Sequence, residues 1–225
     1  EYLDHTLLLK EKLGCIFLQM HNNFQPKNWD RVEQFVEAWP QEVPLAIEFR
    51  HTDWFNEETV SQKLYHLLEI NNIANVLVDT AGRRDIMHMR MTNSEAFIRF
   101  VGANHPSDYE RLDDWVDRLG VWIEDGISKI DFFIHQNVEK ESPLLVTYFI
   151  KKMNKKYGFE QNELNSTRIS MWVSGKSRYA FFVDIIQTQY YAAFQNIKNY
   201  WKRCSELGER ANPKCGFLCM QKKPH

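Results

Sequence analysis

The chain has 225 residues, of which 44% are hydrophobic and 14% aromatic, and its formal net charge is −2. This is enough apolar material for one large core or two small ones, and the balanced charge gives no overall attraction to nucleic acid or an anionic membrane. No apolar run approaches the ~20 residues that span a bilayer, and we expect no signal peptide. Three of the four cysteines lie near the carboxyl end, a pattern that does not suggest a disulfide framework, so we expect a reducing cytoplasm and no membrane partner.

The amino-terminal part of the chain alternates amphipathic and apolar segments. Residues 1–13 have leucines at helical spacing and are predicted to form a helix with one buried stripe. Cys15–Met20 and Pro44–Phe49 are predicted to be buried strands, because each is a short apolar run bounded by polar residues or proline. Between them, Asn28 is expected to cap a helix that continues to Trp39 and ends at the following proline.

The same alternation continues to residue 158. The further predicted strands are Ile73–Val78, Ala96–Val101 and Lys129–Ile134. The further predicted helices begin at Asn56, at Ser107 or Asp108, and at Pro143. A loop, Thr80–Thr92, carries several arginines and a histidine between the third and fourth strands.

Residues 1–160 therefore contain five strand–helix units, the pattern of parallel strands joined by right-handed crossovers. Such strands form either an open doubly wound sheet or a closed barrel. No glycine-rich phosphate loop follows any strand, which argues against a dinucleotide-binding sheet. Polar residues lie at the carboxyl end of one strand after another. In a (β/α) barrel these ends converge on one mouth, so the pattern favours an α/β fold of the TIM type.

Residues 161–225 differ in character from the five units. They are predicted to form an irregular carboxyl-terminal segment that is a candidate for completing the barrel, because five units are few for a closed barrel. Its predicted elements are two strands, Thr167–Val173 and Tyr179–Ile185, and an aromatic-rich helix, Tyr190–Leu207.

The stretch from Pro44 to Trp54 concentrates the most chemistry. A short apolar run is followed by Glu48, Arg50, His51 and Asp53 at the carboxyl end of the predicted strand. Charged groups leave water only when they are paired or used, so we interpret this strand end as the floor of a site. The structural alternative is an ion pair between Glu48 and Arg50.

Three groups at successive strand ends are candidate acid–base catalysts, namely Glu48, Asp79 and His135. Carboxylates and a histidine that share one apolar mouth would have the shifted proton affinities that acid–base catalysis at neutral pH requires. Alternatively, each group satisfies loop amides or pairs with a neighbouring arginine.

Arg50 and Arg99 are candidates for gripping an anion, because guanidinium forks bind phosphate and carboxylate groups. Arg99 is the more informative of the two, since an arginine inside an apolar strand needs an anionic partner. That partner is either a ligand or a carboxylate of an adjacent strand. The predicted substrate-binding set is completed by Gln19, His51, Trp54 and Asn137, although an aromatic residue such as Trp54 is more often part of a core.

A divalent metal is a weaker alternative at the same mouth. Carboxylates with His21 or His51 suit zinc, manganese or magnesium, but the paired histidine spacing of a strong metal motif is absent. We therefore predict no metal site and name no cofactor. Near the carboxyl end, Cys204, Cys215, Cys219 and His225 have a looser spacing than a zinc knuckle, which favours free thiols.

Several short motifs together resemble the YecE-like barrel family, also called domain of unknown function 72. They cover roughly residues 1–158, and their order and spacing are more specific than any one of them alone. The motifs are Phe17-Leu-Gln-Met, Ile47-Glu-Phe-Arg-His with Trp54 beyond it, Val78-Asp79, Phe97-Ile-Arg-Phe-Val-Gly and Phe132-Phe-Ile-His-Gln-Asn.

The resemblance implies a barrel, and it brings no known reaction. It also implies about three strand–helix units before the point where this chain starts, so the barrel is expected to be incomplete at its amino terminus. At Val101 the resemblance leads us to expect a histidine, and its absence weakens any mechanism that needs a base at that position.

Two functional hypotheses follow. The first is an enzyme, of the hydrolase or isomerase type, that acts by acid–base chemistry on a small anionic substrate such as a phosphorylated or nucleotide-like molecule. The second is a non-catalytic barrel protein that binds nucleic acid or a protein partner, which the balanced net charge does not favour. The sequence predicts neither the exact substrate nor the oligomeric state.

Overall fold

The computed structural model describes residues 2–159, which form a mixed α/β structure with parallel strands. The strands are β1 (Ile16–Gln19), β2 (Leu45–Glu48), β3 (Ala74–Asn75), β4 (Leu77–Thr80), β5 (Glu95–Gly102) and β6 (Lys129–Gln136). The α-helices are α1 (Tyr2–Thr6), α2 (Trp29–Glu37), α3 (Asp53–Asn56), α4 (Glu58–Ile70), α5 (Ser107–Glu124) and α6 (Ser142–Tyr157). Short 3₁₀ turns are η1 (Leu7–Lys12), η2 (Pro26–Asn28), η3 (Arg84–Ile86) and η4 (Glu139–Glu141).

The strands form two three-stranded parallel sheets, in the orders β1-β2-β3 and β4-β5-β6. The predicted single strand Ile73–Val78 is in fact two strands, β3 and β4, separated by Val76 alone. The Val76 amide still donates to the Ile47 carbonyl of β2 at 3.0 Å, whereas Leu77 already pairs with Ile98 of β5. The strand is therefore divided because its hydrogen-bonding partner changes from β2 to β5.

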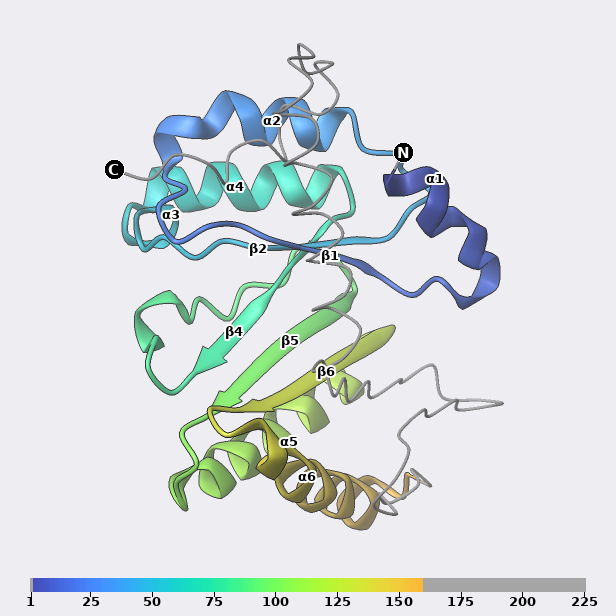
Figure 1. Cartoon of the computed structure of the whole chain (residues 1–225), viewed down its shortest axis with the longest axis vertical. Coiled ribbons are helices and arrows are strands. Elements are labelled where there is room, and N and C mark those ends of the chain that lie inside the picture. Colours follow the sequence, from blue (N-terminus) through green and yellow to red (C-terminus); the bar gives the residue numbers. More distant parts are fainter. Residues whose placement is uncertain (1, 160–225) are drawn as a thin grey trace, which may run out of the picture. The chain divides into compact units, whose positions relative to one another are not determined.

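Spatial neighbours follow the order of the chain, as expected for strands joined by right-handed helical crossovers. Helices α2 and α4 lie next to each other above β1 and β2, and α5 and α6 pack together against β5 and β6 (Figure 1). The arrowheads of β4, β5 and β6 point the same way in Figure 1, so their carboxyl ends share one edge of the sheet. The predicted alternation of strands and helices is confirmed over these residues.

The strands curl toward one face, which we call the inner face. Phe17 of β1 stacks on Phe97 of β5 with ring centroids 5.3 Å apart, and Phe97 stacks in turn on Phe133 of β6 at 4.7 Å. Strands β1 and β5 are not neighbours in either sheet, so these contacts require strong curvature. Nevertheless, β1 and β6 do not pair within the described residues, and the predicted TIM-type (β/α) barrel is not confirmed.

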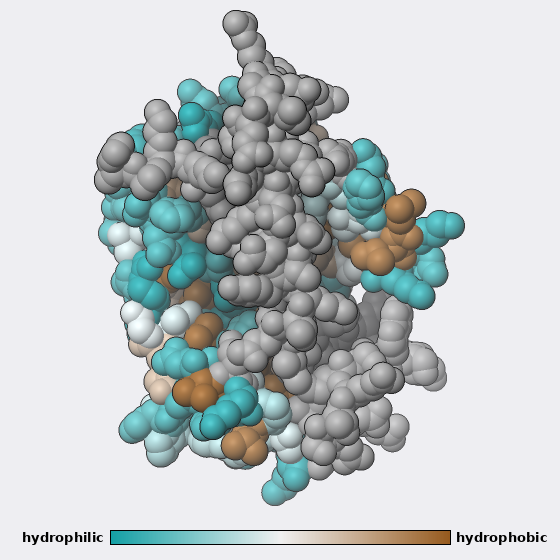
Figure 2. Space-filling view, in the orientation of Figure 1, coloured by the Kyte–Doolittle hydropathy of each residue, from teal (hydrophilic) through white to brown (hydrophobic). Residues whose placement is uncertain are grey.

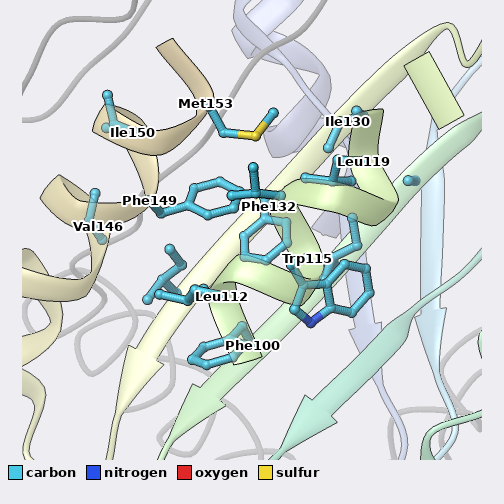
Figure 3. Packing of buried hydrophobic residues seen from close by; sticks show 14 of the residues in the cluster. Phe100, Leu112, Trp115, Leu119, Ile130, Phe132, Val146, Phe149, Ile150 and Met153 are labelled. Carbon is cyan, nitrogen blue, oxygen red and sulfur yellow. The ribbon is translucent and has the colours of Figure 1, made fainter. Parts of the chain in front are cut away.

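The opposite, outer face of β5 and β6 carries the main hydrophobic core. Phe132 is 1% exposed and lies between Trp115 of α5 and Phe149 of α6, with ring centroids 5.5 and 4.5 Å away (Figure 3). One face of α5 makes these contacts, with Leu112, Trp115, Val116 and Leu119 all buried at helical spacing. Trp115 is therefore a core residue.

Two local predictions are wrong. Residues 1–13 do not form one helix with a buried stripe, because α1 and η1 contain no buried residue and the backbone kinks at Lys10, where φ is 51°. Leu7, Leu8 and Leu9 are instead exposed, and apolar surface is visible over this segment in Figure 2. Asn28 precedes α2 without capping it, because its side-chain amide donates to the Gln25 carbonyl. The elements predicted within residues 161–225 lie outside the described residues.

Candidate functional site

The inner face brings together side chains from several strand ends. Successive residues of a strand point to opposite faces, so Arg99 shares the face of Phe97, and His135 shares that of Phe133. Ala46 packs in the same cluster as Phe97, which places Glu48, two residues further along β2, on the inner face as well. Gln19 is the register partner of Glu48. These positions bring together much of the site that the sequence predicts.

Glu48 is the centre of this arrangement, and its side chain is 1% exposed. Its Oε1 accepts a hydrogen bond from Gln19 Nε2 at 3.0 Å, and its Oε2 accepts one from Arg99. Arg50 Nε lies 3.4 Å from Oε1. We call Gln19, Glu48, Arg50 and Arg99 the arginine–glutamate cluster. The carboxylate partner that Arg99 needs is thus found inside the protein.

The cluster still has unused hydrogen-bond donors. A guanidinium carries five N–H donors, and among the described residues Arg99 makes one side-chain hydrogen bond, to Glu48. Arg50 Nε is buried without a hydrogen-bond partner in the described residues. The side chains of Arg99 and Arg50 are 20% and 31% exposed. Donors on two positively charged groups therefore remain available near solvent, which is the property of an anion site.

A loop after β4 braces this cluster. Arg83 Nη2 donates to the main-chain carbonyl of Arg50 at 2.9 Å, and Arg83 Nε donates to Asp85 at 3.0 Å. The Arg83 hydrogen bond lowers the pKa of Asp85 below its usual range. Arg84, the next residue, pairs with Asp79. Arg83 and Arg84 of this loop are thus each paired with a carboxylate, and Arg83 also fixes the backbone at Arg50.

Asp79 occupies the outer face, away from Glu48. In the register of β4 and β5 it is opposite Phe100, which belongs to the outer core. Its side chain is 3% exposed, Oδ1 accepts from Arg111 Nη2 at 2.6 Å and from Arg84, and Oδ2 accepts from Trp115 Nε1 at 2.8 Å. The structure therefore does not bring Asp79 to the other predicted acid–base groups.

Arg111 of α5 is the main residue that the sequence reasoning missed. Its guanidinium donates to the Asp79 carboxylate and main-chain carbonyl, and to Asp108 at 3.1 Å. It also lies over the Phe100 ring, 4.3 Å from the centroid. A signal was present, because Arg111 precedes Trp115 by four residues and side chains at that spacing share a helix face. An arginine on the buried face of a helix needs a carboxylate partner, as Arg99 does.

His135 and Asn137 lie at and beyond the end of β6. His135 is 8% exposed and is the register partner of Val101, the position where a histidine was expected. Asn137 follows the strand and is exposed. His135 therefore faces the same side of the sheet as the arginine–glutamate cluster. It lies on β6, the strand next to β5, which carries Arg99.

His51 and Trp54 follow β2 but differ in exposure. The His51 Nδ1 accepts the Asp53 amide at 3.2 Å, and Nε2 lies 3.0 Å from the Gln25 amide nitrogen. His51 is thus held at the rim beside Arg50. Trp54 is 0% exposed, and its Nε1 donates to the Phe24 carbonyl at 2.6 Å. Its ring also packs against Phe49 at 4.8 Å, so Trp54 belongs to the core.

Two surface cavities lie elsewhere. One of about 340 Å³ is lined by residues that include Gln25 and Asp53, and another of about 220 Å³ lies near Pro44 at the opposite end of β2. Neither of these two cavities is lined by Glu48 or Arg99. Within residues 2–159, no three His, Cys, Asp or Glu side chains are grouped to hold a metal. In the same range, no helix has the length and apolar character to cross a membrane.

Comparisons with known proteins agree with the motifs. A family model described as "Protein of unknown function DUF72" matches residues 1–168. The UPF0759 protein YecE of Escherichia coli strain K12 is 24% identical over an alignment of 165 residues, which covers 65% of this chain and 60% of that protein. The same protein of Escherichia coli O157:H7 matches with the same values. The chain thus spans less than two thirds of the length of these relatives.

Solved structures show the same fold. Two crystal structures of a DUF72 family protein from Enterococcus faecalis V583 superpose with TM-scores of 0.53 and 0.54, at 16% sequence identity. The matches cover 68% and 73% of this chain, and 64% and 66% of the bacterial chains. At this identity the likeness concerns the fold alone, so the site has to be argued from the residues of this chain.

Proposed function

The chain belongs to the DUF72 family, and from that premise we propose that it is an enzyme acting on a small anionic substrate, bound at the arginine–glutamate cluster. One observation carries the proposal. Two arginines, from β5 and from the end of β2, converge on the single carboxylate of Glu48, and their side chains remain 20% and 31% exposed. A purely structural pair needs one cation for one anion, whereas this cluster has a surplus cation.

Glu48 and His135 are the proposed proton-transfer groups. They reach the inner face from β2 and β6, on either side of Arg99, so an anion held by Arg99 would lie between them. A carboxylate and an imidazole are common acid–base groups in enzymes that hydrolyse or isomerise their substrates. Gln19, His51 and Asn137 complete the proposed substrate contacts. Asp79 contacts Arg111, Trp115 and Arg84 on the outer face. These contacts support a role in positioning α5 against the end of β4.

We propose that the scaffold is part of a (β/α) barrel. The support is the parallel, sequential order of the strands and the inward curl that brings Phe17 against Phe97. In such barrels, polar residues at the carboxyl ends of the strands form the active site. Gln19 and Glu48 of the arginine–glutamate cluster are the last residues of β1 and β2, and Arg99 reaches Glu48 from the middle of β5.

Anion binding by the full chain tests the proposal. We expect methyl phosphate or methanesulfonate to raise the melting temperature, because a ligand specific to the native state stabilises it. Arg99→Met should weaken binding at least about tenfold, as expected for losing one charge-assisted contact. Arg90→Met is the matched control, since Arg90 pairs with Glu69 on the exposed surface of α4. If Arg99→Met binds like the wild type, the site is wrongly placed.

Catalysis is tested separately from binding. The full chain and its His135→Gln variant are incubated with a mixture of small organic anions, and the products are compared by mass spectrometry. A hydrolase adds one water to its substrate, whereas an isomerase changes retention without a change in mass. Conversion that depends on His135 supports the proposal, and identical product profiles for both proteins contradict it.

The alternative, a protein that binds nucleic acid or a protein partner, has less support. Arg83 and Arg84 are the arginines that could have formed a basic surface beside the mouth, and both are paired with carboxylates. Phosphate contacts release counterions, so this alternative predicts salt-dependent retention on single-stranded nucleic acid.

A further inference from the structure

We infer that the arginine–glutamate cluster selects anions with one negative charge over anions with two, and that Glu48 sets this preference. The inference rests on the proposed function, because it concerns the ligand of the same site. It narrows the substrate to carboxylates, sulfonates and phosphodiesters, which carry a single charge at neutral pH. Phosphomonoesters and sulfate, which carry close to two charges, are disfavoured.

The charge count supports this preference. Arg50 and Arg99 bring two positive charges to the cluster, and Glu48 brings one negative charge, which leaves one net positive charge. The other nearby arginines do not add to it, because Arg83 is paired with Asp85 and Arg84 with Asp79. An anion with one charge therefore neutralises the cluster, and a second charge has no cation to balance it.

Because Glu48 is buried, its negative charge directly affects the affinity for a bound anion. Its side chain is 1% exposed, and hydrogen bonds from Gln19 and Arg99 hold both carboxylate oxygens. Glu48 cannot turn away into solvent when a ligand arrives, so its negative charge stays close to the bound anion. At the effective dielectric of a partly buried site, one unbalanced charge at this range changes affinity about tenfold or more.

Geometry also favours a flat or tetrahedral oxyanion. The guanidinium of Arg99 lies over the Phe17 ring, 5.4 Å from the centroid, so the ring limits the freedom of the guanidinium plane. A fixed guanidinium offers paired N–H donors, which match two oxygens of a carboxylate, sulfonate or phosphodiester. The Arg50 side chain, 31% exposed, brings a second guanidinium to the same place.

Two tetrahedral anions of similar size test the preference. Methanesulfonate carries one charge and sulfate carries two, and their affinities for the full chain are measured by calorimetry at neutral pH and constant ionic strength. The wild type should bind methanesulfonate at least about tenfold more tightly than sulfate. Acetate and dimethyl phosphate, both singly charged, then distinguish a carboxylate ligand from a phosphodiester one. Tighter binding of sulfate by the wild type overturns the inference without any variant.

The Glu48→Gln variant should reverse the preference. It keeps the shape of the side chain and one acceptor oxygen for Arg99, while its NH2 group needs the Gln19 amide to turn and accept. The variant leaves two net positive charges, so sulfate should gain at least tenfold relative to methanesulfonate. Glu69→Gln on α4 makes the same change in net charge outside the cluster and should leave the ratio unchanged. A ratio that is the same in Glu48→Gln and the wild type overturns the role of Glu48.

The two proposals fail in distinguishable ways. If neither anion binds the folded wild type, the anion site itself is wrong, and the charge preference falls with it. If both anions bind and Arg99→Met weakens both, but without a preference, the site stands and the inference alone is overturned.

Discussion

Trp115 of α5 donates a hydrogen bond from Nε1 to Oδ2 of Asp79 in β4, at 2.8 Å. The other oxygen of the same carboxylate accepts from Arg111, four residues before Trp115 on the same helix. One face of α5 is thus attached to the end of β4 through a single buried carboxylate. Because both partners come from one helix, Asp79 fixes the rotation of α5 as well as its distance from the sheet.

Asp79→Ala should destabilise the protein by about 3 kcal/mol, because it leaves the guanidinium of Arg111 buried without its main partner. The Arg111 side chain is 16% exposed, whereas Arg84, the other partner, is 52% exposed. Urea denaturation of the full chain measures the change in the free energy of unfolding. Arg84→Met is the control and should cost less than about 1 kcal/mol. Equal effects of Asp79→Ala and Arg84→Met would contradict the buried role.

Stability should fall as the pH drops from about 6.5 to 4, and His88 should account for part of that loss. Burial lowers the pKa of His88 to about 4, and its Nε2 lies 3.1 Å from the Val76 carbonyl. Between these pH values the unfolded chain binds a proton that the folded chain does not, so the folded state is favoured above this window and loses that advantage below it. The full shift corresponds to roughly 3 kcal/mol.

The His88 prediction is checked by measuring the free energy of unfolding from pH 4 to 7.5. His88→Gln should reduce the slope in that window, since glutamine cannot take up the proton. His21→Gln, at an exposed position, is the control. If the difference in the free energy of unfolding between the wild type and His88→Gln does not change with pH, the folded protein does not keep His88 neutral in this pH window.

Cys15 should react slowly with alkylating reagents in the folded protein. Burial raises the pKa of its thiol to about 12, so very little reactive thiolate exists at pH 8. The measurement uses a full-length variant in which Cys204, Cys215 and Cys219 are replaced by serine. Iodoacetamide labelling should be at least about a hundredfold slower in buffer than in concentrated urea. Similar rates in both conditions would show that Cys15 is accessible.

Phe132→Ala should be among the most damaging core substitutions, costing about 3 to 5 kcal/mol. Phe132 contacts both α5 and α6, so the cavity lies where the two helices meet the sheet. Leu144→Ala is the control, because Leu144 is 63% exposed and should change stability by no more than about 0.5 kcal/mol. Thermal or urea denaturation distinguishes these outcomes. A loss for Phe132→Ala no larger than that of the control would rule out this packing.

Much of the fold could be predicted because apolar runs mark buried parallel strands directly. Arg99 shows how far such reasoning extends to the site, since an arginine in an apolar strand implied an anionic partner, either a ligand or a carboxylate, and Glu48 provides a carboxylate. The position of Asp79 could not be predicted in the same way. Which face it occupies depends on the change of pairing at Val76, and hydrogen-bonding partners are not encoded in the apolar pattern.

Helix faces were predictable only where apolar spacing was clear. The start of α5 was predicted at Ser107 or Asp108, but Arg111 was overlooked because a charged residue interrupts an apolar pattern. At the amino terminus the opposite happened, because leucine spacing alone indicated a buried stripe that no described element covers. Spacing indicates which residues can share a face, and tertiary packing decides whether that face is buried.

The single residue between β3 and β4 has an evolutionary consequence. Because side chains alternate along a strand, deleting or inserting one amino acid at Val76 would exchange the orientations of Val78 and Asp79. The aspartate would then enter the aromatic interior beside Phe97, and a valine would face Arg111. Length variation should therefore be selected against at this joint.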